Sequence, residues 1–187
     1  MKRFVRISLS VALILSSSIP VSAQEALWKN LCGKFDLLYE NEKYTEAAKV
    51  AEEALKVAEK TFGPNHPNVA ASLSYLGRIY NGQARYSEAE PLLKRSLAIR
   101  EKVRGPDHPD VAWALNNLAL LYDKQGKNTE AESLYKRALA IRETTLGPEH
   151  PDVATVCENL SKLYRKIGKT NEAVRFEIRA KKIRSRA

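Results

Sequence analysis

The sequence predicts an all-α fold, a solenoid of about four stacked helix-turn-helix hairpins. Two observations lead to this prediction: an internal repeat of 42 residues, and helical spacing of the apolar residues within each copy. The residues that recur at this period are His66, His108 and His150; Gly63, Gly105 and Gly147; Leu76, Leu118 and Leu160; Tyr80, Tyr122 and Tyr164; and Ala47, Ala89, Ala131 and Ala173. Because one hairpin cannot bury both of its helices, successive hairpins are expected to stack and share a core.

Each copy is predicted to contain two helices joined by a polar turn. In the third copy, Val111, Leu115, Leu118 and Tyr122 follow one another at spacings of three and four residues, which places them on one helical face. The polar turn DKQGKN comes next, and a second amphipathic helix follows it. The predicted hairpins cover residues of about 25–62, 66–104, 108–146 and 150–185.

Two of the second helices carry a sequence pattern typical of a capping box. Ser87 is followed three residues later by Glu90, and Thr129 is followed in the same way by Glu132. In a capping box these two side chains bond each other's backbone N–H groups at the start of a helix. We therefore expect these helices to begin at Ser87 and Thr129.

A GPxHP segment separates successive hairpins, as in LGPEHPDVA of the last joint. Gly147 is expected to end one helix, and Pro148 cannot continue it. Pro151 is tolerated at the start of the next helix, where its missing N–H costs little. The sequence leaves two candidates for the N-cap of that helix, the histidine and the residue before it. In this copy the residue before it is Glu149, which is a weak capping residue.

The three recurring histidines are expected to be structural. Equivalent residues in stacked hairpins lie roughly 10 Å apart, because that is the usual spacing of packed helices. Two nitrogen ligands of one zinc ion lie within roughly 4 Å of each other. The sequence therefore predicts no metal site and no cofactor at these histidines.

The first and last copies depart from the repeat. Phe35 and Leu38 stand where a small residue and a tyrosine are expected, so the first helix is predicted to act as an N-terminal cap. Glu177 replaces the apolar residue found at Leu93 and Tyr135, so the last helix is predicted to act as a C-terminal cap.

The pattern of these copies resembles the tetratricopeptide repeat. It comprises Leu76-Gly77, Tyr80 and Ala89; Leu118-Ala119, Tyr122 and Ala131; and Leu160-Ser161, Tyr164 and Ala173. The longer period and the GPxHPxVA joint resemble the kinesin light chain class, which is also widespread in bacterial proteins. The resemblance covers nearly all of the chain after residue 23. It implies a right-handed superhelical solenoid that serves as a non-enzymatic protein–protein interaction module.

The resemblance also implies where a partner binds, because the first helix of each pair lines the concave face in this family. Carried onto this chain, the groove positions are Tyr75, Arg78 and Asn81; Trp113, Asn116 and Asn117; and Asn159, Lys162 and Arg165. Asparagine amides can bond an extended peptide backbone, and the cations favour carboxylates on the ligand. Aromatic side chains are frequent anchors in interfaces. The expected partner is a protein or peptide segment, with acidic groups as one possibility.

The N-terminal segment has the features of a secretory signal peptide. Lys2, Arg3 and Arg6 precede a short apolar run, and small residues lead to a predicted cleavage between Ala23 and Gln24. The run is too short to span a bilayer, although a membrane anchor is the alternative. Residues 1–23 are therefore predicted to be a signal peptide, and the protein is expected to be exported, either to the periplasm or into the medium.

Cysteine positions, sequence motifs and charge limit the functions that the sequence predicts. Cys32 and Cys157 fall in the first and last copies, too far apart for a disulfide. The sequence has no pattern typical of a nucleophile with its base, of a phosphate-binding loop or of a zinc ligand set, so no enzyme is expected. Removal of residues 1–23 lowers the formal net charge from +9 to +6. An excess of this size favours acidic partners, but export argues against nucleic acid. After residue 23 no stretch is long enough to be a transmembrane segment.

A structural role is the alternative to a peptide-binding role. The segment Arg165–Ala187 holds nine basic and two acidic residues. Such a helix is either solvated or in contact with an acidic surface, for example through Arg175–Ala187 at the cell envelope. In this alternative the protein oligomerises or attaches to the envelope through its ends.

Overall fold

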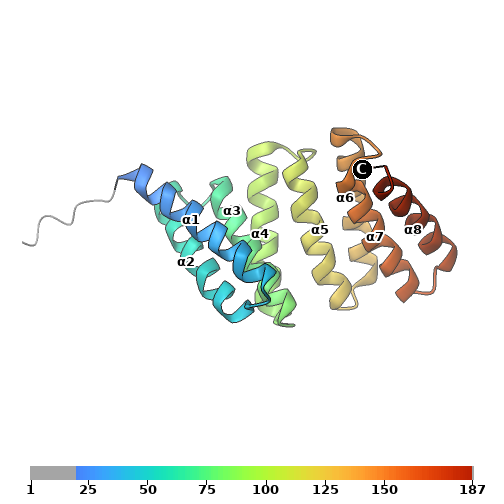
Figure 1. Ribbon diagram of the computed structural model, residues 1–187, viewed down its shortest axis with the longest axis horizontal. Coiled ribbons are helices and arrows are strands. Elements are labelled where there is room, and N and C mark those ends of the chain that lie inside the picture. Colours follow the sequence, from blue (N-terminus) through green and yellow to red (C-terminus); the bar gives the residue numbers. More distant parts are fainter. Residues whose placement is uncertain (1–19, 187) are drawn as a thin grey trace, which may run out of the picture.

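The computed structural model describes residues 20–186, and this part of the chain folds into eight α-helices without a strand. The helices are α1 (Val21–Glu40), α2 (Tyr44–Phe62), α3 (Pro67–Gly82), α4 (Tyr86–Arg104), α5 (Pro109–Lys124), α6 (Asn128–Leu146), α7 (Pro151–Lys166) and α8 (Thr170–Arg184). They pair in chain order into four antiparallel hairpins, and each hairpin packs on the next. Figure 1 shows the hairpins as a row from α1 to α8. The predicted all-α repeat solenoid is confirmed.

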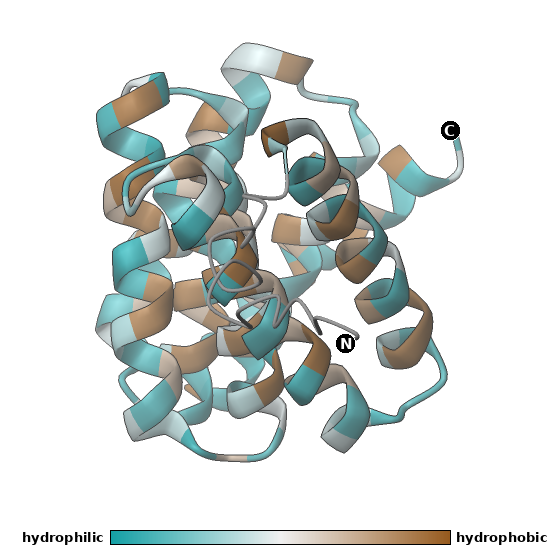
Figure 2. Cartoon of the chain, turned by 90° about the vertical axis from the view of Figure 1, so that its left-hand side faces the viewer, coloured by the Kyte–Doolittle hydropathy of each residue, from teal (hydrophilic) through white to brown (hydrophobic). Residues whose placement is uncertain are grey.

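Among the described residues, apolar side chains on facing helices form four core clusters. The largest cluster extends from α5 to α8, with Leu115, Tyr135 and Leu160 all fully buried. Viewed from the α1 end, the helices carry hydrophobic and hydrophilic bands side by side, as amphipathic helices do (Figure 2). Each hairpin therefore depends on its neighbours for burial of its apolar surface.

The GPxHP joints end one hairpin and start the next. Gly63, Gly105 and Gly147 have φ values of 83, 87 and 90°, a conformation that glycine adopts without a steric penalty. In each joint the Nδ1 atom of the histidine accepts a hydrogen bond from the backbone N–H two residues later, at 3.1–3.2 Å. The histidine is thus the N-cap of α3, α5 and α7, and the question left open by the sequence is settled in its favour.

The prediction of capping boxes at Ser87 and Thr129 was wrong. Helices α4 and α6 begin one residue earlier, and no side chain caps them. Glu90 instead accepts hydrogen bonds from Tyr122, at 3.2 Å, and from Lys127, both in the following hairpin. Tyr122 and Lys127 are close enough to bond the Glu90 carboxylate across the hairpin interface, so it does not bond the start of its own helix.

Glu132 repeats this arrangement 42 residues later. Its carboxylate accepts from the Tyr164 hydroxyl at 3.0 Å and from the Lys169 ammonium at 3.3 Å. The recurring glutamate and tyrosine therefore join successive hairpins rather than closing a helix end.

A recurring arginine joins the hairpins a second time. Arg95, Arg137 and Arg179 each pair with a glutamate of the preceding second helix, at 2.5–2.7 Å. Each also donates to the carbonyl oxygen of the first proline in the joint before it. These repeated polar contacts fix how far one hairpin is displaced from the next.

The two cysteines lie in different hairpins, Cys32 in α1 and Cys157 in α7. Cys157 is fully buried in the core, at the position of Leu73 and Leu115. Burial raises the pKa of both thiols to about 11. Neither thiol therefore forms a reactive thiolate readily at neutral pH.

Candidate protein-binding groove

A pocket in the middle of the solenoid gathers side chains from five consecutive helices. Its volume is about 350 Å³, and we call it the central pocket. Its lining comprises Ala71 and Tyr75 of α3, Arg100 of α4, Pro109, Asp110 and Trp113 of α5, Arg142 and Leu146 of α6, and Asp152 of α7. Three stacked hairpins thus contribute to one concave site, which is the form that a groove for an extended segment takes.

Two arginines give the central pocket its charge. Arg100 lies with its guanidinium carbon 5.0 Å from the Trp113 ring centroid, and its side chain is only 11% exposed. Its nearest carboxylate, that of Asp110, is 3.9 Å away, which is too long for a hydrogen bond. Burial lowers the pKa of Arg100, although an arginine stays protonated at any physiological pH. The pocket therefore holds a buried cation with a distant partner.

Arg142 is the same residue one repeat later. It is 5% exposed, and it donates to the backbone carbonyl of Asp152 at 2.6 Å. Burial lowers its pKa as well. Because a guanidinium carries five N–H donors, this one carbonyl leaves most of its donor capacity for other acceptors. Two such guanidiniums at one pocket favour a ligand with carboxylate groups.

Sequence reasoning missed these two arginines. It considered only the first helix of each pair, whereas Arg100 and Arg142 lie on second helices, near their C-terminal ends. The signal was available, because Arg100, Arg142 and Arg184 follow the 42-residue period. Arg184, in the last copy, donates instead to Glu158 and Thr155 of its own hairpin.

The predicted positions on α3 are occupied partly by internal contacts. Tyr75 lines the central pocket, and its ring also packs on that of Phe35, with centroids 4.3 Å apart. Arg78 lies over the Tyr39 ring at 4.4 Å. Asn81 is only 8% exposed, so its placement on an open groove surface was wrong.

Some of the predicted positions on α5 and α7 line the central pocket, whereas others are buried between helices. Trp113 is half-buried and forms a wall of the central pocket. Asn116 and Asn117 are 8% and 7% exposed, so their placement on an open groove surface was also wrong. The physical reason is that α5 packs against α3 on one side and α7 on the other, which closes the space between first helices. The Asn159 side chain donates to the side-chain Oδ1 of Asn116 at 2.9 Å and so helps to close the space between α5 and α7.

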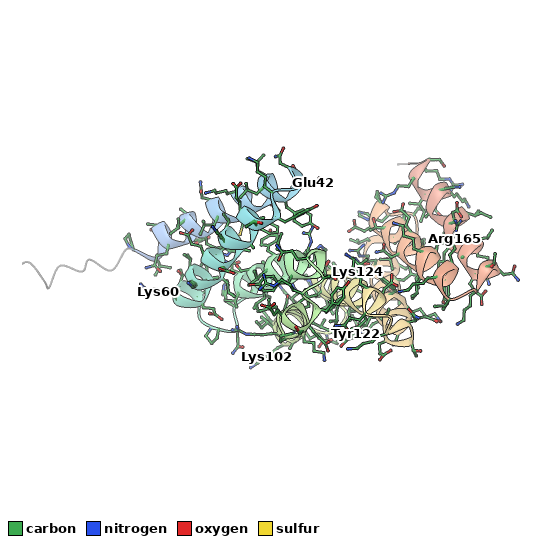
Figure 3. The ribbon with its side chains drawn as sticks, turned by 90° about the horizontal axis from the view of Figure 1, so that it is seen from below. Glu42, Lys60, Lys102, Tyr122, Lys124 and Arg165 are labelled. Carbon is green, nitrogen blue, oxygen red and sulfur yellow. The ribbon has the colours of Figure 1, made fainter. Side chains whose placement is uncertain are left out.

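Lys162 and Arg165 lie away from the central pocket. Both are exposed, and both line a second pocket of about 610 Å³ between α7 and α8. Arg165 pairs with Glu177 across this pocket. Figure 3 shows Arg165 on the last hairpin, far along the row from Glu42 in the first. Four of the nine predicted groove residues therefore line a pocket: Tyr75 and Trp113 line the central pocket, and Lys162 and Arg165 line the second.

Between residues 20 and 186 no group of three or more histidine, cysteine or acidic side chains is placed to hold a metal ion. None of the helices described there is both long and apolar enough to cross a bilayer.

The predicted cleavage site lies at the start of α1. Most of the predicted signal peptide falls outside the described residues, but Ala23 and Gln24 are in the first turn of this helix. The Gln24 side chain accepts a hydrogen bond from the Thr61 hydroxyl of α2 at 2.8 Å. The first residue of the predicted mature chain thus contacts the first hairpin.

Comparison with known proteins places this architecture in a family. The tetratricopeptide repeat model matches residues 36–102, 83–144 and 124–186. No curated protein matches the chain.

Solved structures are similar over most of the chain. The crystal structure of BtubC (BKLC) from P. vanneervenii has a TM-score of 0.75 and 26% identity, covering 87% of this chain and 65% of that one. This chain therefore spans somewhat less than two thirds of BtubC. The kinesin light chain nearly identical TPR-like repeats of Podosopora anserina give a TM-score of 0.71 and 26% identity, covering 89% of this chain and 77% of that one.

Repeat families of this kind act as scaffolds for protein–protein interaction, and their partners are proteins. The 42-residue period, the histidine-capped joints and the matches to known proteins agree with one another. The chain belongs to the tetratricopeptide repeat family, in its kinesin light chain-like class.

Proposed function

We propose that this protein is an exported, non-enzymatic interaction module that binds an extended, acidic segment of a partner protein along its concave side. The observation that carries the proposal is the central pocket, where Arg100 and Arg142 are buried with no carboxylate of residues 20–186 at hydrogen-bond distance. A ligand carboxylate would offset the cost of burying these charges, because a buried cation is stable only when it is paired.

Trp113 supplies the uncharged part of the proposed recognition. It is half-buried on α5 and lines the central pocket. The Trp113 ring offers an apolar surface for a side chain of the bound segment.

Export is the second part of the proposal. It is supported by the basic, then apolar, then small-residue order of the first 23 residues. The periplasm and the medium both remain destinations under this proposal. The partner segment is then one that meets the protein outside the cytoplasm.

Attachment through the basic C-terminal segment has less support. Seven of its nine cations form ion pairs with acids of this chain, for example Arg179 with Glu143 and Arg186 with Glu149. These pairs reduce the positive charge that the segment presents to an envelope surface. The groove is therefore the better supported contact.

The proposal is tested by titrating the protein with fluorescently labelled, end-capped peptides of about twelve residues. One peptide carries spaced glutamates and one aromatic residue, and its matched control has every glutamate replaced by glutamine. We expect the acidic peptide to bind at least about tenfold more tightly, since charged hydrogen bonds contribute about 1.5–3 kcal/mol each.

Variants locate the binding. Arg100→Gln and Trp113→Ala are expected to weaken binding of the acidic peptide, whereas Lys102→Gln, which removes an exposed cation from the same helix as Arg100, is expected to leave it unchanged. Equal binding of the two peptides, or equal effects of Arg100→Gln and Lys102→Gln, would contradict the proposal.

A further inference from the structure

We propose that a second copy of this chain docks its helix α1 onto the groove between α7 and α8, and so continues the solenoid head to tail. This groove is the pocket of about 610 Å³ that contains Lys162 and Arg165, separate from the central pocket. Figure 1 shows that α1 and α8 lie at opposite ends of the row of helices. Each copy therefore has both halves of the proposed interface, and neither half covers the other.

The groove lies where a further hairpin would pack. Glu177 and Lys181 on its α8 wall correspond, 42 residues earlier, to Tyr135 and Leu139. Those two residues of α6 belong to the core that α6 shares with α7. The α8 wall is thus in the position of an interface between hairpins, but with charged residues in place of apolar ones.

Helix α1 carries the other half of the interface. Leu27 and Leu37 are 42% and 61% exposed. Shifted by the repeat, Leu27 corresponds to Val69, Val111 and Val153, and Leu37 to Ile79, Leu121 and Leu163, all at most 1% exposed. In every later hairpin these positions are buried, whereas in α1 they lie open to solvent. Two exposed leucines at positions that are buried in every later hairpin favour a covering partner.

Charge complementarity identifies that partner as a second copy. One small core cluster joins Ala89 and Leu93 of α4 to Leu118 and Leu121 of α5. A shift of two repeats toward the C-terminus takes Ala89 and Leu93 to Ala173 and Glu177 of α8. A shift of two repeats toward the N-terminus takes Leu118 and Leu121 to Lys34 and Leu37 of α1, which here belong to the next copy. Leu93 and Leu118 belong to this one interior cluster, and their positions thus become Glu177 and Lys34 at the contact between copies.

A second polar pair follows from the same shift. Inside the chain, the Lys166 ammonium of α7 bonds the Asp123 carboxylate of α5 at 2.8 Å. One repeat further along, Asp123 corresponds to Arg165 of one copy, and Lys166 corresponds to Glu40 of the next copy. These two residues again carry opposite charges. Arg165 lies on the exposed side of the last hairpin in Figure 3. Arg165 and Glu177 pair with each other within one copy, so docking exchanges that pair for an Arg165–Glu40 pair and a Glu177–Lys34 pair between copies.

An interface of this kind is heterologous, because it joins two different surfaces. It leaves one α1 and one α7–α8 groove uncovered after each addition, so association continues into open chains or closes into a ring. The charged pairs set the register, and they make association weaker at high salt.

The experiment is sedimentation velocity of the purified protein over a range of concentrations at low ionic strength. The wild type is expected to form species larger than the monomer as concentration rises. Lys34→Glu and Glu177→Lys place like charges opposite each other and are each expected to raise the dissociation constant about tenfold. The double variant Lys34→Glu/Glu177→Lys restores opposite charges and is expected to associate like the wild type again.

Lys56→Glu is the matched control, because Lys56 is an exposed cation on α2, away from both proposed surfaces. It is expected to associate like the wild type. Circular dichroism of each variant checks that the helices remain folded. A wild type that stays monomeric at every concentration, or a double variant that associates no better than either single one, overturns the proposal. Binding of the acidic peptide is a separate readout, and these variants are expected to leave it unchanged.

Discussion

A histidine that recurs at a fixed place suggests chemistry, but in this protein it holds a helix end. His66, His108 and His150 each accept one backbone hydrogen bond through Nδ1. This contact satisfies one of the free N–H groups that every helix start exposes. The proline that follows fixes the backbone of the first helical residue. The joint therefore repeats because each hairpin needs the same helix start.

Loss of this cap is expected to cost stability and to leave binding intact. We predict that His108→Ala with His150→Ala lowers the free energy of unfolding by about 1–3 kcal/mol in total, measured by urea denaturation. Replacement of both by asparagine, a good capping residue, is expected to recover most of the loss. Loss of acidic-peptide binding by a double variant that is still folded would sink the structural role of these histidines.

Glu90 links two hairpins, because its carboxylate accepts hydrogen bonds from Tyr122 and Lys127 of the following hairpin. Hydrogen bonds from Lys94, Lys127 and Gln125 hold its pKa at about 2, below the ordinary value of 4.5. A carboxylate with a depressed pKa stabilises the folded state fully above the ordinary value and loses this effect as pH falls through the folded value.

Glu90→Gln is therefore expected to destabilise the protein by about 1 kcal/mol at pH 7, since the carboxylate is partly exposed. We expect the difference from the wild type to shrink as pH falls from about 5 to about 2. Thermal unfolding of both proteins across this pH range measures it. A difference that stays constant with pH would show that the ion pairs of Glu90 do not stabilise the fold.

At the scale of the helix pair, burial between neighbours determines which positions tolerate charge. Tyr135 of α6 is fully buried in the core shared with α7, whereas Glu177, the same position in α8, keeps its charge at the surface. The identity of a residue in one copy therefore does not predict its environment in another. Interior and end hairpins differ in what covers them, not in their own geometry.

Tyr135→Glu tests this difference directly. It is expected to lower the free energy of unfolding by about 3–5 kcal/mol, because it removes a large buried side chain and buries a carboxylate. Glu177→Gln, at the equivalent end position, is expected to change it by less than about 1 kcal/mol. Chemical denaturation of the two variants makes the comparison, and similar losses for both would refute the stated difference between interior and end hairpins.

For the molecule as a whole, the sequence predicts the architecture better than the site. The repeat of Gly, His, Leu and Tyr fixes where hairpins begin and end, because these residues act through local backbone and neighbour contacts. Burial of Asn81, Asn116 and Asn117 depends on how closely successive first helices approach, which no spacing along the chain reports. Arg100 and Arg142 follow the period, but their common pocket appears only when three hairpins are stacked.

Export can be checked on the whole chain. We predict that the protein recovered from outside the cytoplasm begins at Gln24, and mass spectrometry of the intact protein measures this. The contact between Gln24 and Thr61 remains possible after cleavage at that bond. An exported protein that keeps Met1, or one found only in the cytoplasm, would contradict the predicted signal peptide.

Binding of an acidic segment at the central pocket can be followed through the tryptophans. The chain contains two tryptophans, and they report on different places. Trp113 lines the pocket, whereas the Trp28 indole donates to Ser72 at 2.9 Å, between α1 and α3. We predict that titration with the acidic peptide shifts the indole N–H resonance of Trp113 in NMR spectra and leaves that of Trp28 in place. A peptide that binds without moving the Trp113 resonance would contradict the account.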